Sequence, residues 1–304
     1  MTVCVAAISE YGTIIGAADT MLSSGDIQFE PGRNVSREPR WGKVYSVTNS
    51  IVAMTAGDMG IQSEILFDHM SPAVRQWLDD NPKKWLPFNE AIHIYCDCYN
   101  IVRHEKATRA ILSPFGLTYD TFINKQKSMD PAFVRQVTSS LAEFKLPETA
   151  TIMAGVEPAL KEGTTFSRLA IIHGDDVQSN DVARFGAVGI GARHANSHFM
   201  ISGYGPDIGL QETLLSVYAA KKKAEVAPGV GRDTIMFILG PALGSFQWLK
   251  PEVQARIDET FLDLVKTQKL ATSKALDNLN QYLKELNQTS KEENPQTPPG
   301  SPSS

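Results

Sequence analysis

Short apolar runs with the length of β-strands begin at the third residue of this chain and recur in groups separated by pairs of helical patterns. Residues 3–8 and 13–18 flank the turn Glu10-Tyr11-Gly12, which is a hairpin pattern. Further strand-like and helical patterns alternate along the chain: strands at 43–47 and 51–56, helices at 61–78 and 87–112, strands at 149–156, 167–172 and 185–188, helices at 192–201 and 208–225, and a strand at 234–239. Groups of strands followed by groups of helices predict an α+β fold with packed sheets covered by helices, rather than repeated βαβ units.

The remaining length falls outside this alternation. At 304 residues the chain is long enough for two domains. Residues 113–147 follow no single pattern beyond a helix expected over 131–144, and we interpret them as an insertion or a lid. Residues 251–287 predict a C-terminal helical extension, either one helix or two with a break near Thr267. Residues 288–304 contain four prolines and no large apolar side chain, which predicts a disordered tail.

Composition and charge exclude several classes of protein. Lys and Arg number 29 against 34 Asp and Glu, so the net charge of −5 gives no electrostatic basis for a nucleic-acid partner. No run approaches the roughly 18 apolar residues that span a bilayer, so we expect no membrane insertion. Three cysteines cannot build a disulfide framework, and the first residues lack the pattern of a secretory signal. These features predict a soluble, cytoplasmic protein.

The second residue, Thr2, is a candidate nucleophile. Methionine is normally removed when the next residue is small, which would leave Thr2 at the N-terminus. A terminal threonine has a hydroxyl and, on the same residue, an α-amine with a pKa of about 7.7–8.0 that can act as general base. Thr2 leads directly into an apolar strand, and a strand holds a terminus more rigidly than a frayed end does. Met-Thr is by itself a common start, so Thr2 needs support from other residues.

Three residues at strand ends provide that support. Asp19 ends an apolar strand, where an isolated aspartate is normally a turn or capping residue. Lys43 enters another strand; in a buried site its charge would lower the pKa of a neighbouring amine and would need a carboxylate partner. Gly57 ends a strand before a helix, where exposed N–H groups can stabilise an oxyanion, although a glycine there is also typical of a tight turn.

Taken together, these elements resemble a known family. Thr2, the hairpin ending in Ala17-Ala18-Asp19, the pair Lys43-Val44 and the run Met54-Thr55-Ala56-Gly57 are similar to the motifs of proteasome β-subunits, which are N-terminal nucleophile hydrolases. The interval from Lys43 to Gly57 matches that family without a gap, and the stretches 152–156 and 187–192 resemble it more faintly. The resemblance implies one domain over residues 2–245: a four-layer αββα sandwich of two antiparallel sheets covered by helices.

The resemblance also implies a role for each site residue. Thr2 would be the nucleophile and its α-amine the base, Lys43 would tune that amine, Asp19 would hold Lys43, and the Gly57 N–H would face the oxyanion. Two departures from the family lie near this site. Ile190 stands where the family usually has a serine, and residues 227–231 lack the usual aspartate and serine before the last strand. Part of the hydrogen-bond network is therefore missing or supplied from elsewhere, for which Asp233 and Glu225 are candidates.

Three functional hypotheses follow. Thr2, Asp19 and Lys43 favour a threonine-type amide hydrolase, and the resemblance implies a peptidase that acts on peptides or proteins and assembles into homo-oligomeric rings. The departures favour a non-catalytic, proteasome-like structural subunit. A third hypothesis is an amidase of the same superfamily that acts on a non-peptide amide. None of these needs a cofactor or a metal, and the pairs His194/His198 and Cys96/Cys98 lack the pattern of a metal site.

Overall fold

Two five-stranded antiparallel sheets form the centre of the fold, which confirms the α+β class. The computed structural model describes residues 2–24, 27–29, 42–159 and 163–293. The first sheet contains, in spatial order, β10 (Phe185–Gly189), β1 (Val3–Ile8), β2 (Ile14–Asp19), β11 (Thr234–Leu239) and β12 (Gln247–Trp248). The second contains β5 (Val44–Thr48), β6 (Ile51–Gly57), β7 (Thr149–Pro158), β8 (Thr165–His173) and β9 (Asp176–Ser179).

Four of the described strands have no counterpart among the predicted strands. The strand β9 is exposed along its whole length and has Val177 as its single large apolar residue, so it gives no apolar run. The strand β12 is only two residues long. A separate two-stranded hairpin, β3 (Leu22–Ser24) with β4 (Ile27–Phe29), precedes a stretch outside the described residues. Apolar periodicity detects strands that are buried on at least one face, and these are short or exposed.

Side chains from both sheets meet in one buried cluster. From β1 and β2 it takes Cys4, Ala6, Ile8, Ile14 and Ala18, and from the second sheet Val52, Met54, Ala56, Ile152, Ala154 and Val156, among others. Every residue of β1 is buried, which explains why its sequence is a continuous apolar run instead of an alternating one. The N-terminal strand is therefore a central strand that lies between β10 and β2, and the residue that precedes it is held in place.

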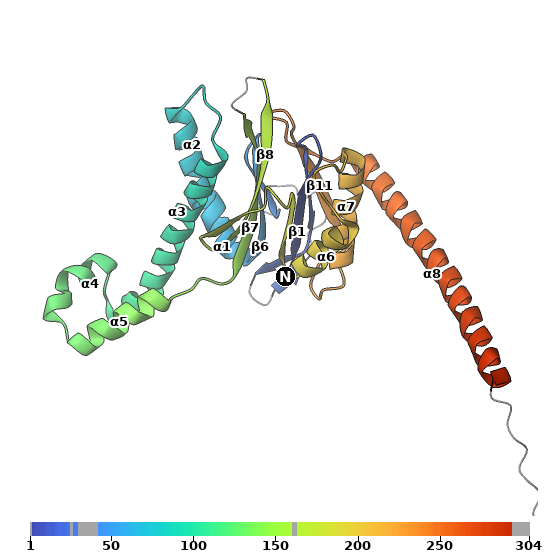
Figure 1. The fold of residues 1–304 in the computed structure, drawn as a ribbon. Coiled ribbons are helices and arrows are strands. Elements are labelled where there is room, and N and C mark those ends of the chain that lie inside the picture. The colour runs from blue at the N-terminus through green and yellow to red at the C-terminus, as the bar shows by residue number, and fades with distance from the viewer. Residues whose placement is uncertain (1, 25–26, 30–41, 160–162, 294–304) are drawn as a thin grey trace, which may run out of the picture. The chain divides into compact units, whose positions relative to one another are not determined.

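Helices pack against both sheets. The second sheet shares a buried cluster with α1 (Met59–Ser63), a π-helical segment η2 (Glu64–Met70), α2 (Ser71–Asp80) and α3 (Phe88–Ala107). The helices α6 (Ala192–Ser202) and α7 (Leu210–Ala224) contact the first sheet. Figure 1 shows α2 and α3 beside β6 and β7, and α6 and α7 beside β1 and β11. Asp58 begins α1 as its N-cap and accepts a hydrogen bond from the Ile61 N–H (3.0 Å).

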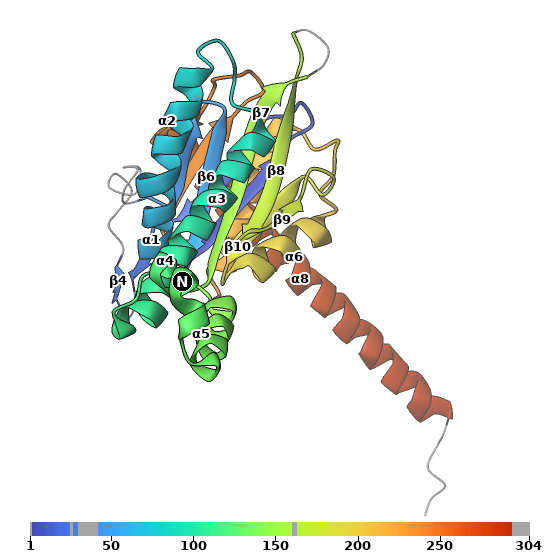
Figure 2. The same cartoon turned by 90° about the vertical axis from the view of Figure 1, so that its left-hand side faces the viewer.

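The segment expected to be an insertion or a lid is helical. The helix α3 continues through a π-helical turn, η3 (Thr108–Leu112), and then come η4 (Ser113–Phe115), α4 (Tyr119–Lys125), η5 (Gln126–Ser128) and α5 (Pro131–Glu143). The last of these is the predicted helix. Leu112, Phe122 and Val137 form a small core of their own, and α4 and α5 lie beyond the C-terminal end of α3 (Figure 2).

The C-terminal extension is one continuous helix, α8 (Pro251–Glu293), without a break at Thr267. The helix passes the expected end at 287, so the predicted tail is wrong for residues 288–293; residues 294–304 lie outside the described residues. Lys291, Glu292 and Glu293 are good helix formers, so the polar composition of this stretch is compatible with a helix.

The chain divides into two compact units inside α8, Met1–Gln254 and Ala255–Ser304. The predicted boundary between residues 245 and 251 is therefore shifted, because the first turn of α8 is anchored to the sheet. Gln254 is buried, and its Nε2 donates a hydrogen bond to the Thr234 carbonyl of β11 (2.6 Å). No helix of the described residues is long and apolar enough to cross a bilayer.

Candidate functional site

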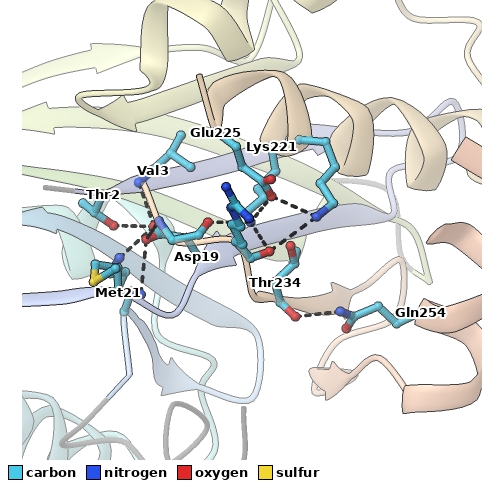
Figure 3. Close-up of polar contacts among 12 residues, drawn as sticks. Thr2, Val3, Asp19, Met21, Lys221, Glu225, Thr234 and Gln254 are labelled. Carbon is cyan, nitrogen blue, oxygen red and sulfur yellow. Dashed lines mark hydrogen bonds and ion pairs between the residues drawn. The ribbon is translucent and has the colours of Figure 1, made fainter. Parts of the chain in front are cut away.

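The Asp19 carboxylate is the centre of a buried polar cluster at the start of β1. Its Oδ1 accepts hydrogen bonds from the Thr2 hydroxyl (2.6 Å), the Val3 N–H (2.8 Å) and the Lys43 ammonium (2.7 Å). Figure 3 shows the Thr2 and Asp19 side chains pointing toward one another. Thr2, Asp19 and Lys43 are all buried, so the structure brings together three of the four predicted site residues.

The second carboxylate oxygen is held by the backbone. Asp19 Oδ2 accepts from the Met21 N–H (3.2 Å) and from the Gly231 N–H (2.9 Å), which lies far away in the sequence. With five donors, one of which is the Lys43 ammonium of the ion pair, the buried carboxylate is well compensated for its loss of water. Asp19 was expected to hold Lys43, and it also holds the hydroxyl of Thr2.

Sheet register explains why these residues meet. Asp19 is the last residue of β2, and the antiparallel pairing of β1 with β2 brings Val3 and the adjacent Thr2 to the same end of the sheet. Lys43 immediately precedes β5 in the other sheet, where its carbonyl accepts the Thr55 N–H (2.8 Å). The ion pair between Lys43 and Asp19 therefore links the two sheets next to Thr2. The Lys43 side chain is 2% exposed and the Asp19 side chain 0%.

Position 57 requires a glycine because the backbone of Glu148 approaches it closely. Its φ is +106°, and a Cβ atom there would lie 2.1 Å from the Glu148 carbonyl oxygen. Gly57 also lines the pocket that contains Thr2. Its role as an oxyanion donor stays a prediction.

A pocket of about 890 Å³ opens beside Thr2. Its wall includes Gly57 from the second sheet, Gly189 and Ile190 at the end of β10, and Arg193 and Asn196 from α6. A volume of this size is typical of a ligand site. Thr2 thus contacts the Asp19 carboxylate of the buried ion pair and also lines the pocket.

Two stretches where the sequence departs from the motifs that it resembles lie near this site. Ile190 lines the pocket and is 49% exposed, so it presents an apolar side chain there. Glu225 does not substitute for the missing groups, because its carboxylate binds Lys221 (2.6 Å) and Lys222 (3.0 Å) instead. The other candidate, Asp233, stays a prediction. Gly231 was missed, since a backbone N–H donor leaves no side-chain signature in a sequence.

Cys4 lies two residues from Thr2, and its thiol is buried. The thiol donates to the Thr55 carbonyl (3.3 Å), and burial raises its pKa to about 12. We expect iodoacetamide at pH 8 to leave Cys4 unmodified in the native protein and to alkylate it after denaturation, because the thiolate is the reacting form. Peptide mass spectrometry of the two samples measures this; rapid native alkylation of Cys4 would show that the strand opens.

Among the described residues, no group of three or more His, Cys, Asp or Glu side chains is placed to hold a metal ion. Comparison of the chain with models of known protein families found no match, and a search of curated proteins found no similar sequence. A functional assignment therefore depends on the geometry around Thr2.

Proposed function

We propose that this chain is a threonine-type amide hydrolase of the N-terminal nucleophile class, similar to proteasome β-subunits and acting as a peptidase. The observation that carries the proposal is the Asp19 carboxylate, which binds both the Thr2 hydroxyl and the Lys43 ammonium beside a pocket that Thr2 lines. Burying a lysine–aspartate pair costs desolvation free energy, so such a pair is weak evidence for a stabilising role. Its position beside Thr2 favours a role in catalysis instead.

In this proposal, cleavage of the peptide bond before Thr2 frees the α-amine that serves as base. The amine accepts the hydroxyl proton as Oγ1 attacks the carbonyl carbon of the substrate amide. The Gly57 N–H stabilises the oxyanion that forms, and the amine of the leaving group departs with a proton. Water then hydrolyses the threonine ester, which releases the acid and restores the hydroxyl. The Lys43 ammonium favours the neutral, basic form of the nearby amine.

The proposal extends to the arrangement and assembly of the chain. We infer that the two sheets and their helices form a four-layer αββα sandwich, as in the family that the sequence resembles. By the same resemblance we expect homo-oligomeric rings, a peptide or protein substrate, and a location in the cytoplasm. The ring prediction is checked by mass photometry at micromolar concentration, where a monomer would count against it.

A structural, non-catalytic subunit is the second candidate. It is favoured by Ile190, which puts an apolar side chain in the pocket wall, and by residues 227–231, which lack the aspartate and serine of the motif that the sequence resembles. If the missing serine and aspartate are indispensable, the Thr2 site would be a remnant that has kept its ion pair.

Labelling of Thr2 separates these candidates. A peptide epoxyketone forms a ring with a threonine hydroxyl and its own free α-amine, so we expect it to add to Thr2 after Met1 is removed. Thr2→Ala should abolish the adduct, and Thr2→Ser, which keeps a hydroxyl and a free amine, should retain it. Intact-mass and peptide mass spectrometry measure both processing and labelling. Retention of Met1 in the native protein, or an adduct that survives in Thr2→Ala, would contradict the proposal.

A further inference from the structure

Lys221, in the last turn of α7, is a buried lysine that the proposed chemistry does not use. Its side chain has no exposed surface. The ammonium donates to Glu225 Oε1 (2.6 Å) and to the backbone carbonyls of Gly231 (2.9 Å) and Arg232 (3.0 Å). Three N–H groups thus meet three acceptors, and two of these acceptors belong to the loop before β11.

That loop also supports the Asp19 carboxylate. Gly231 accepts from Lys221 through its carbonyl and donates to Asp19 Oδ2 through its N–H (2.9 Å). Figure 3 shows the resulting chain of contacts between α7, the loop and the end of β2. Lys221 and Gly231 are both buried, so water does not compete for these bonds.

We propose that Lys221 is a positioning residue for the Thr2 site, which fixes the Gly231 amide against Asp19 and thereby the orientation of the Thr2 hydroxyl. The inference rests on the proposed function. It also explains how residues 227–231 can support the site without a polar side chain. The Gly231 backbone N–H, which Lys221 holds in place, supplies the hydrogen bond to Asp19.

The charge on Lys221 supports this role at neutral pH. Burial lowers the pKa of its ammonium to about 8, an effect that the neighbouring Lys222 reinforces and that Glu225 and Asp19 oppose. At pH 7 the ammonium therefore keeps all three N–H donors, whereas a neutral amine has two. Lys221 does not line the pocket beside Thr2, so it affects the reaction through the loop and not through contact with a substrate.

The test compares Lys221→Met with Lys222→Met at pH 7. Methionine keeps the length of the side chain and removes every donor, and Lys222 is the neighbouring lysine, 22% exposed, that binds the same Glu225 carboxylate. We expect Lys221→Met to slow the maximal rate of Thr2 labelling by about tenfold with little change in inhibitor affinity, because it disturbs orientation and leaves the pocket intact. Lys222→Met should change either quantity by less than about twofold.

Hydrogen exchange of the Gly231 amide provides a readout besides activity. In Lys221→Met we expect exchange of this amide to accelerate by about tenfold or more, while amides in β1 keep their protection. If the wild-type protein is not labelled at Thr2, the proposed function fails, and the exchange experiment still reports on the contact. The inference would be overturned if the Gly231 amide of Lys221→Met exchanged at the wild-type rate. It would also be overturned if Lys221→Met weakened inhibitor affinity but left the maximal rate of Thr2 labelling unchanged.

A milder variant keeps the test valid if Lys221→Met does not fold. Glu225→Gln removes the charge partner of Lys221 and leaves the two carbonyl acceptors in place. We expect an intermediate fall in the maximal labelling rate, of about threefold, with faster exchange at Gly231. Suppose that Lys221→Met cannot fold and that Glu225→Gln has the wild-type labelling rate and the wild-type exchange rate at Gly231. Lys221 would then contribute to stability alone, and the inference would be wrong.

Discussion

Replacing Asp19 with asparagine is expected to destabilise the protein by about 3–5 kcal/mol and to abolish labelling of Thr2. The substitution leaves the Lys43 ammonium buried without its carboxylate at 2.7 Å. It also exchanges one acceptor oxygen for an NH2 group, which faces donors because both carboxylate oxygens of Asp19 accept hydrogen bonds. Two buried donors or more would then lose their acceptor.

Urea denaturation of the wild type and a small set of variants measures this effect. Asp181→Asn is the matched control: its carboxylate pairs with Arg168 at 2.6 Å but is 30% exposed, so its loss should be about 1 kcal/mol. The pair Lys43→Met and Asp19→Asn should be strongly non-additive, because the double variant buries no unpaired charge. Additive free energies of unfolding would contradict the coupling that we place beneath Thr2.

Gly189→Ala should destabilise the protein by about 3 kcal/mol or more and should displace Thr2. Gly189 pairs with Val3 in the ladder between β10 and β1 and has a φ of +93°. A Cβ atom there would lie 2.2 Å from the Thr2 carbonyl oxygen, which is a backbone atom, so no flexible side chain can move away to relieve the contact. The start of β1 must shift instead, and Thr2 shifts with it.

Gly203→Ala is the control for this prediction. It introduces the strain of a side chain at positive φ but no clash with a neighbouring backbone atom. Gly203 ends α6 with a φ of +67°, and a Cβ atom there would meet nothing within 4 Å. We expect a loss of about 1 kcal/mol in this control, with normal labelling of Thr2. Thermal and urea unfolding give the stabilities, and mass spectrometry gives the labelling. Equal losses for Gly189→Ala and Gly203→Ala would show that the clash near Thr2 is relieved without displacing the strand.

Much of the fold follows from periodicity in the sequence. The strands β1, β2, β6, β7 and β11 are buried, and long apolar runs mark them clearly. The strands β12, β3 and β4 were missed because they are only two or three residues long, and β9 was missed because it is exposed along its length. The end of α8 was placed too early because polar composition also suits a solvated helix.

The candidate site divides in the same way between sequence and tertiary structure. The sequence by itself determined which residues are candidates for the chemistry, because Thr2, Asp19, Lys43 and Gly57 stand at the ends of recognisable strands. Only the tertiary structure decided how they meet: the register of β1 and β2 and the approach of the second sheet make Asp19 the shared acceptor for Thr2 and Lys43. The contributions of Gly231 and Lys221 depend on backbone groups brought together across distant segments, and backbone amides are the same at every position of a sequence.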